Sequence, residues 1–215
     1  MGRITDSIIS GTTGRTGRIV VANINGIEIS RIRPKKTTKP PSAKQNLVKK
    51  RFNQSVIFIQ SYKEYAKAFY GTRVKLRSSY NQAMSNIINA LELDMDNLTI
   101  IPHYNKIQFS KGIGIKPIPT AISSPTTLKI LIDWENNAPN SDAENDYLVI
   151  LLAEDQELEN ETIFLETTAQ RKDLSYEFSV LPRYQNKEMH VWIAFVNEDN
   201  LFASNSTYIG TVTVT

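Results

Sequence analysis

The chain has 215 residues, of which 40% are hydrophobic and 22% are charged, and it contains no cysteine. This composition is ordinary for a globular protein, and the missing cysteine excludes disulfides, thiol nucleophiles and thiolate zinc sites. No apolar run reaches the roughly 18–20 residues that cross a bilayer, and no N-terminal segment has the apolar core of a Sec signal peptide. We therefore expect no membrane insertion, and a location in the cytoplasm or in an assembled particle.

Positive charge is concentrated in the first part of the chain. Residues 1–119 contain 20 lysines and arginines against 6 acidic residues, whereas residues 120–215 contain 5 against 16. Residues 1–52 alone contain 12 basic and 2 acidic residues. Such polarity influences which partners a protein meets, and how fast, more than it influences the fold.

A β-hairpin is predicted after a small, polar lead-in over residues 1–16. Two β-branched runs, 18–24 and 27–33, flank Asn25-Gly26. This dipeptide favours a type I′ turn, because both central residues of that turn need positive φ. We expect the lead-in to be extended and mobile unless it docks on something. A two-stranded hairpin is marginal in water, so this one needs a further surface.

Two helices are predicted over residues 42–97. The preceding segment PKKTTKPP, residues 34–41, is expected to be an extended tether. Ser42 and Gln45 form a capping box that starts the first helix, and Gly71 is expected to end it. A second helix is expected to start at Ser79. The apolar face predicted for the first helix consists of Val48, Phe52, Val56, Ile59, Ala66 and Phe69.

From about residue 98, short β-branched runs separated by turn residues predict an antiparallel β-sandwich of the fibronectin-III or immunoglobulin type. Trp134 and Trp192 are its predicted large core residues. The predicted strands are 104–109, 118–123, 127–135, 146–153, 162–168, 175–181, 189–196 and 206–214. The predicted fold class is therefore α+β, with a basic hairpin arm and tether at 1–41, a helical segment at 42–97 and a β-sandwich domain at 98–215.

An ordered set of motifs runs through nearly the whole chain. It consists of Gly14-x-x-Gly-Arg-Ile-Val-Val, Asn25-Gly26, Arg31-x-Arg-Pro-Lys-Lys, Lys39-Pro-Pro-Ser-Ala-Lys-Gln45, Arg51-Phe52, Asp133-Trp134, Val191-Trp-Ile-Ala-Phe195 and Ser204-Asn-Ser206. The set resembles a family of Bacteroidota proteins of unknown function, which have a Gly-rich N-terminal hairpin, a Gln/Arg/Phe helix start and a C-terminal β-sandwich. The chain departs from that family at Ile24-Asn25, where the family has an aromatic residue followed by lysine, and in the spacing from Gln45 to Arg51. The resemblance implies this arrangement of hairpin, helix and β-sandwich, and it identifies no catalytic residue.

No motif in the chain has the spacing of a known catalytic or cofactor site. The glycines at positions 11, 14 and 17 precede a predicted strand, whereas a dinucleotide-binding turn follows a strand and opens a helix. Neither His103 nor His190 has a partner at the spacing of metal ligands. We therefore expect no enzyme activity, no cofactor and no small-molecule substrate.

The acidic loop 133–146 is the one candidate for a metal. Asp142, Glu144 and Asp146 offer carboxylates to Ca²⁺, but the loop lacks the glycine and the final glutamate of an EF-hand. A solvated connection between strands is the simpler interpretation, and we expect no metal site.

The basic arm has two competing roles. It could bind nucleic-acid phosphates in a salt-dependent way, or it could dock on the acidic sandwich of another copy and add its hairpin to a sheet edge there. A head-to-tail contact that does not close builds a filament or lattice. We favour the second role: a non-enzymatic structural subunit, homo-oligomeric, of a filament, phage-like particle or surface layer. The residues predicted for assembly are Ile19, Val21, Ile27, Ile29, Arg31, Arg33, Lys35 and Lys36, and those for phosphate contact in the alternative are Lys49, Lys50 and Arg51.

Overall fold

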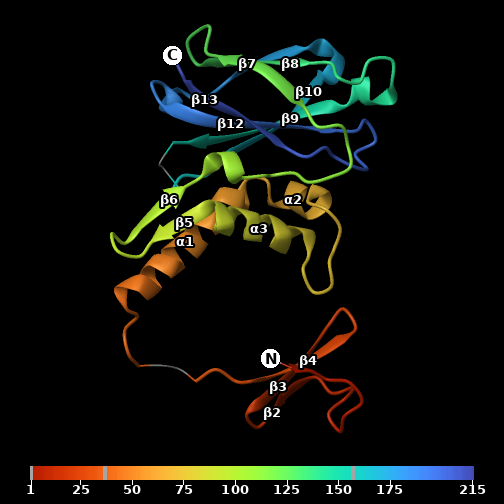
Figure 1. Cartoon of the computed structure of the whole chain (residues 1–215), viewed down its shortest axis with the longest axis vertical. Helices are drawn as coiled ribbons and strands as arrows, with labels where there is room; N and C mark the ends of the chain where they lie inside the picture. The colour runs from red at the N-terminus through yellow and green to blue at the C-terminus, as the bar shows by residue number, and fades with distance from the viewer. Residues whose placement is uncertain (1, 36–37, 156–157) are drawn as a thin grey trace. The chain divides into compact units, whose positions relative to one another are not determined.

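The structure, a computed structural model, describes residues 2–35, 38–155 and 158–215 (Figure 1). These residues form two compact units. One contains the described residues up to Ser42 together with Val74–Leu76, and the other contains Ala43–Arg73 and Arg77–Thr215. We call the first the arm unit and the second the body, and we describe each by itself.

The arm unit is built on the predicted hairpin. β3 (Ile19–Ile24) and β4 (Ile27–Ile32) pair antiparallel, with Ile19 opposite Ile32 and Ile24 opposite Ile27. Asn25 and Gly26 connect the two strands with φ values of 51° and 79°. A type I′ turn requires these positive values, and the hairpin prediction is confirmed.

The lead-in adds two edge strands to this hairpin. β1 (Gly2–Arg3) pairs with β4 and β2 (Gly14–Thr16) pairs with β3, so that the strand order is β1-β4-β3-β2. Glu28 holds the loop between the edge strands. Its carboxylate accepts hydrogen bonds from the Ser10 hydroxyl at 3.0 Å and from the Gly11 amide at 2.7 Å. The lead-in therefore docks, and its partner is the hairpin of its own chain.

The body begins with three helices and a short hairpin. α1 (Ala43–Gln60) starts directly after Ser42, as predicted, but the first predicted helix is divided, and its second half is α2 (Lys63–Phe69). α3 (Ser79–Ala90) starts at Ser79, as predicted, and is capped by the Ser78 side chain, which accepts from the Asn81 amide. No helix within the described ranges is long and apolar enough to span a membrane. The hairpin that follows, β5 (Leu91–Asp94) and β6 (Thr99–Pro102), was not predicted.

The predicted apolar face of the first helix is confirmed in part, since Ile59 and Ala66 are buried and Val56 and Phe69 pack against the core. Val48 and Phe52 are 42% and 56% exposed, whereas Leu47, Gln54 and Ser55 are buried. Ser55 is tolerated inside because its hydroxyl donates to the Arg51 carbonyl of the preceding turn, at 2.9 Å. The apolar pattern is wrong in the first half of the helix, where polar side chains occupy part of the buried face, and agrees with the structure in the second half.

Seven strands form the predicted antiparallel β-sandwich, so the α+β fold class is confirmed. The three-stranded sheet has the order β11-β8-β7, and the four-stranded sheet has the order β10-β9-β12-β13. The predicted strand at 104–109 is wrong, because Tyr104–Lys106 is a 3₁₀ helix. The strands are β7 (Ile118–Ser123), β8 (Lys129–Glu135), β9 (Tyr147–Glu154), β10 (Ile163–Gln170), β11 (Ser175–Ser179), β12 (Glu188–Val196) and β13 (Thr207–Thr213).

The four-stranded sheet is the middle layer of the body. Figure 1 shows the helices on one side of it and β7 and β8 on the other. Ile150 of β9 and Ile193 of β12 belong to the core between the sheets, together with Trp134. Trp192 lies in a second core with residues of the helices such as Phe58. Because β9 and β12 are covered on both faces, they are continuous apolar runs, unlike the alternating strands of a solvent-exposed sheet.

Candidate functional site

The arm unit exposes both basic and apolar side chains. Its segments, residues 1–42 and 74–76, contain 9 lysines and arginines against 2 acidic residues. Arg31, Arg33 and Lys35 are exposed. Ile19 and Ile32, which are cross-strand neighbours on one face, are 42% and 68% exposed. Exposed apolar pairs and exposed clusters of positive charge each have the character of an interaction surface. Arg31 points to the opposite face of β4 from Ile32, because side chains alternate along a strand.

The other apolar residues predicted for assembly are less accessible. Val21 and Ile29 are buried and Ile27 is half-buried. β3 and β4, which carry these residues, are the inner strands of the sheet, and its edges are the short strands β1 and β2. An added strand would therefore meet the edge strands first. The remaining predicted residue, Lys36, lies outside the described residues.

The residues predicted for phosphate contact lie in the first half of α1. Consecutive residues of a helix point about 100° apart, so Lys49, Lys50 and Arg51 spread around the helix axis. Lys50 forms an ion pair with Glu159 at 3.1 Å, and Arg51 is half-buried. The fold does not gather these three side chains into one phosphate-binding surface.

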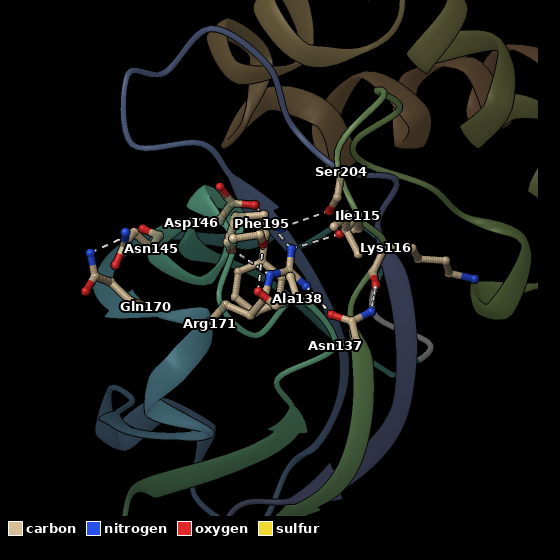
Figure 2. A network of polar contacts seen from close by, with 12 residues as sticks. Ile115, Lys116, Asn137, Ala138, Asn145, Asp146, Gln170, Arg171, Phe195 and Ser204 are labelled. Atoms are coloured by element: carbon tan, nitrogen blue, oxygen red, sulfur yellow. Dashed lines mark hydrogen bonds and ion pairs between the residues drawn. The ribbon is translucent and has the colours of Figure 1, made fainter.

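A buried arginine connects several loops at one end of the sandwich (Figure 2). The guanidinium of Arg171 is fully buried and donates to Asp146 Oδ2 at 3.3 Å and to Asn137 Oδ1 at 2.6 Å. It also donates to the backbone carbonyls of Ile115, at 2.9 Å, and Ala143, at 3.0 Å. Its carbon Cζ lies 4.0 Å from the ring centroid of Phe195. The arginine thus ties together segments that are far apart in the sequence.

Asp146 of the acidic loop belongs to this network. Burial raises the pKa of Asp146, and the hydrogen bond and positive charge of Arg171 offset part of that shift. Burial also lowers the pKa of Arg171. Glu144 accepts the Asn140 amide at 3.0 Å. Within the part of the chain that the structure describes, no group of three or more His, Cys, Asp or Glu side chains could hold a metal ion.

A second network of polar side chains, which no sequence pattern indicated, is centred on His190. Its Nε2 lies 2.9 Å from Asp155 Oδ1 and its Nδ1 lies 2.8 Å from the Tyr208 hydroxyl. The imidazole stacks on Tyr104, with 3.6 Å between the ring centroids. The order carboxylate–imidazole–hydroxyl is that of a nucleophile-activating triad.

The phenol of Tyr208 is harder to ionise than that of a free tyrosine. Burial raises the pKa of its phenol, and the negative charges of Asp155 and Glu188 act in the same direction. The two hydrogen bonds hold the His190 ring between Asp155 and Tyr208. The sequence gives little sign of this arrangement, because the partners are 18 and 35 positions from His190.

The structure defines a class of protein in which a basic β-sheet unit precedes a β-sandwich with a helical layer on one sheet. Residues 11–210 match the family described as "Family of unknown function (DUF6266)", and the chain belongs to this family. No curated protein matches the chain.

Two solved structures are similar to part of the chain. They are the crystal structure of the FN1–FN3 domains of chicken CNTN1 and the solution structure of the fn3 domain of human contactin 1. Each is 12% identical, with a TM-score of 0.34, over 48% and 49% of this chain respectively. The matched part spans 34% of the chicken chain and 84% of the human one. The fold class rests on the strand order described above.

Proposed function

We propose that this protein is a non-enzymatic structural subunit, in which the arm unit of one copy contacts the acidic body of another. The observation that supports this most directly is the division of opposite charge between two separately compact units. The arm unit holds 9 basic and 2 acidic residues, while the body holds 16 basic and 20 acidic residues. Complementary charge on two units steers the encounter between copies and disfavours other partners.

The surface of the arm unit suits such a contact. The exposed pair Ile19 and Ile32 offers apolar area that charge alone does not provide. The edges of the arm sheet are the short strands β1 and β2, and a sheet edge presents backbone groups to which another chain can pair. We therefore assign the apolar part of the contact to Ile19 and Ile32, because Val21 and Ile29 are buried. We assign its charged part to the exposed residues Arg31, Arg33 and Lys35.

A contact between different surfaces of two copies need not close on itself. If it does not close, it produces a filament or lattice, which is compatible with a phage-like particle or a surface layer as well as with a free filament. We also propose, from the motif set of the chain, that the protein comes from a Bacteroidota organism.

The test is light scattering on the purified full-length protein as it elutes from a sizing column. We expect large particles with a protein-like ratio of absorbance at 260 and 280 nm. The triple variant Arg31→Glu, Arg33→Glu, Lys35→Glu should elute as a small species, because it reverses charge on the arm unit. The matched control Lys106→Glu, Lys111→Glu, Lys116→Glu reverses as many charges on exposed lysines of the body. It should still assemble.

Salt provides an independent check. Charge attraction is screened over about 8 Å at 0.15 M salt and about 3 Å at 1 M, so the particles should shrink at high salt. A wild-type monomer, or assembly that survives the arm variant, would contradict the proposal. Nucleic acid that copurifies and leaves at high salt would support the alternative, a protein that uses its basic arm to bind phosphates.

A further inference from the structure

Two loops of the body, residues 111–116 and 197–203, run side by side at one end of the sandwich. The Gly114 amide donates to the Ala203 carbonyl at 3.0 Å. The approach is so close that a Cβ at Gly112 would lie 2.0 Å from the Ala203 carbonyl oxygen. A residue with a side chain would not fit there, so glycine lets the backbone of the first loop rest on that of the second.

Further hydrogen bonds order both loops. The Arg171 guanidinium donates to the Ile115 carbonyl of the first loop at 2.9 Å (Figure 2). In the second loop, Asn197 Oδ1 accepts the amides of Leu201 at 2.7 Å and Phe202 at 2.8 Å. Neither loop therefore depends on buried apolar side chains of its own to keep its backbone in place.

These ordered loops hold apolar side chains in water. Ile113 is 89% exposed and Leu201 is 76% exposed, and Ile115 and Phe202 are exposed as well. We call these four residues the loop patch. Apolar side chains that are exposed singly are normal, but four on two adjoining loops are a candidate contact surface. Because the loops are already ordered, little conformational entropy would be lost when a partner covers them.

The charges beside the loop patch indicate which partner it fits. The first loop contains Lys111 and Lys116, and the second contains Glu198 and Asp199. All four side chains are exposed, and none of the ion pairs in the described part of the chain includes them. A basic arm unit would be repelled by the lysines of the first loop. A second copy of the same surface carries equal numbers of both charges and can match each with its opposite.

We propose that the loop patch is a two-fold interface between the bodies of two copies. In such an interface both copies use the same surface, so residues 111–116 of one copy face residues 197–203 of the other, and symmetry repeats the contact. The apolar side chains then form the centre and the charged ones the polar rim. This interface goes beyond the arm contact proposed above, because it joins two bodies without the arm unit.

Sedimentation velocity of the full-length protein tests this inference. The charge-reversed arm variant described above is the background, so that the arm contact does not contribute to the mass. We expect this background to form a dimer. Adding Ile113→Ser and Leu201→Ser should weaken dimerisation by about tenfold or more, because each change occurs twice in a symmetric interface. Leu181→Ser, at a residue that is 58% exposed and outside both loops, is the matched control and should leave the dimer unchanged. A background that is monomeric at every concentration measured would overturn the inference.

Charge exchange tests the two-fold geometry. The double variant Lys111→Glu, Lys116→Glu carries negative charge on both loops, and Glu198→Lys, Asp199→Lys carries positive charge on both. In the same background each variant should be monomeric alone, whereas an equimolar mixture should form heterodimers, because opposite charges then meet at both contacts. Both variants should keep the melting temperature of the background, since the changed side chains are exposed. Dimers of either variant alone, or a mixture that stays monomeric, would overturn the inference.

The two proposed contacts can fail separately. The size of the wild-type particles reports on the arm contact, and the dimer of the arm variant reports on the loop patch. The control variant of the body described above reverses both lysines of the first loop. It should therefore still assemble through its arm unit while it loses the two-fold contact.

Discussion

The arm unit and the body are stabilised in different ways. In the described part of the arm unit the buried apolar residues are Ile4, Val21 and Ile29. In the body, by contrast, each residue of β12 from Met189 to Val196 is buried, and two cores lie on opposite faces of one sheet. The arm unit depends on paired strands, a well-formed turn and the hydrogen bonds to Glu28. The difference teaches that apolar burial holds the body together, while the arm unit keeps its charged and apolar side chains at the surface.

The largest expected effect comes from the buried arginine of the body. Arg171→Met leaves the Asp146 carboxylate buried without its partner, and we expect a loss of about 3–5 kcal/mol in the free energy of unfolding. Urea denaturation measures this loss. Lys172→Met at the exposed neighbouring position and Arg33→Met in the arm unit should each change it by less than about 0.5 kcal/mol. A loss below about 1 kcal/mol for Arg171→Met would mean that the buried arginine adds little more to stability than an exposed one.

Two phenylalanines of α1 sharpen the comparison within one helix. Phe58 is buried and meets Trp192 edge to face, with 6.1 Å between the ring centroids. We expect Phe58→Ala to cost about 3–4 kcal/mol, because it leaves a cavity between the helices and the sheet. Phe52→Ala should cost less than about 0.5 kcal/mol, because that side chain is exposed. Similar losses in urea denaturation of the two variants would mean that Phe52 is as buried as Phe58, as the sequence pattern predicts.

A variant of the hairpin turn tests whether the arm unit unfolds separately. Gly26 has a φ of 79°, and alanine at this position should cost about 1–2 kcal/mol. In hydrogen exchange, we expect Gly26→Ala to lower the protection of amides in β3 and β4 and to leave those in β9 and β12 unchanged. Equal loss of protection in the body would mean that the two units unfold together.

The smallest expected effect concerns pH. A hydrogen bond from Lys187 lowers the pKa of Glu154 below its ordinary value of 4.5. Ionised Glu154 therefore adds stability above about pH 4.5, and this contribution is lost as the pH falls from there through the folded-state pKa. Urea denaturation between pH 3 and pH 6 should show a shallower pH dependence for Lys187→Met than for the wild type. An unchanged dependence would mean that this ion pair adds nothing to the stability of the body.

Local sequence signals were sufficient for much of the fold. Asn25-Gly26 specifies its turn through backbone conformation, and α1 starts directly after Ser42, where the local sequence predicts it. Seven of the eight predicted strands are present, because β-branched and aromatic runs between turn residues are the local pattern of a strand. Trp134 and Trp192 are both buried, because burial removes their large apolar surface from water, although Trp192 packs against the helices and not between the sheets.

Only the tertiary structure decided which surfaces meet. The docking of the lead-in on Glu28, the inward face of α1 and the unpaired oxygen of Gln54 each depend on a neighbour that no local pattern identifies. Arg171 reaches Ile115 across 56 positions of the sequence, and His190 reaches Asp155 across 35. A buried polar group is stable only where such partners converge, and their convergence is set by the packing of the whole body.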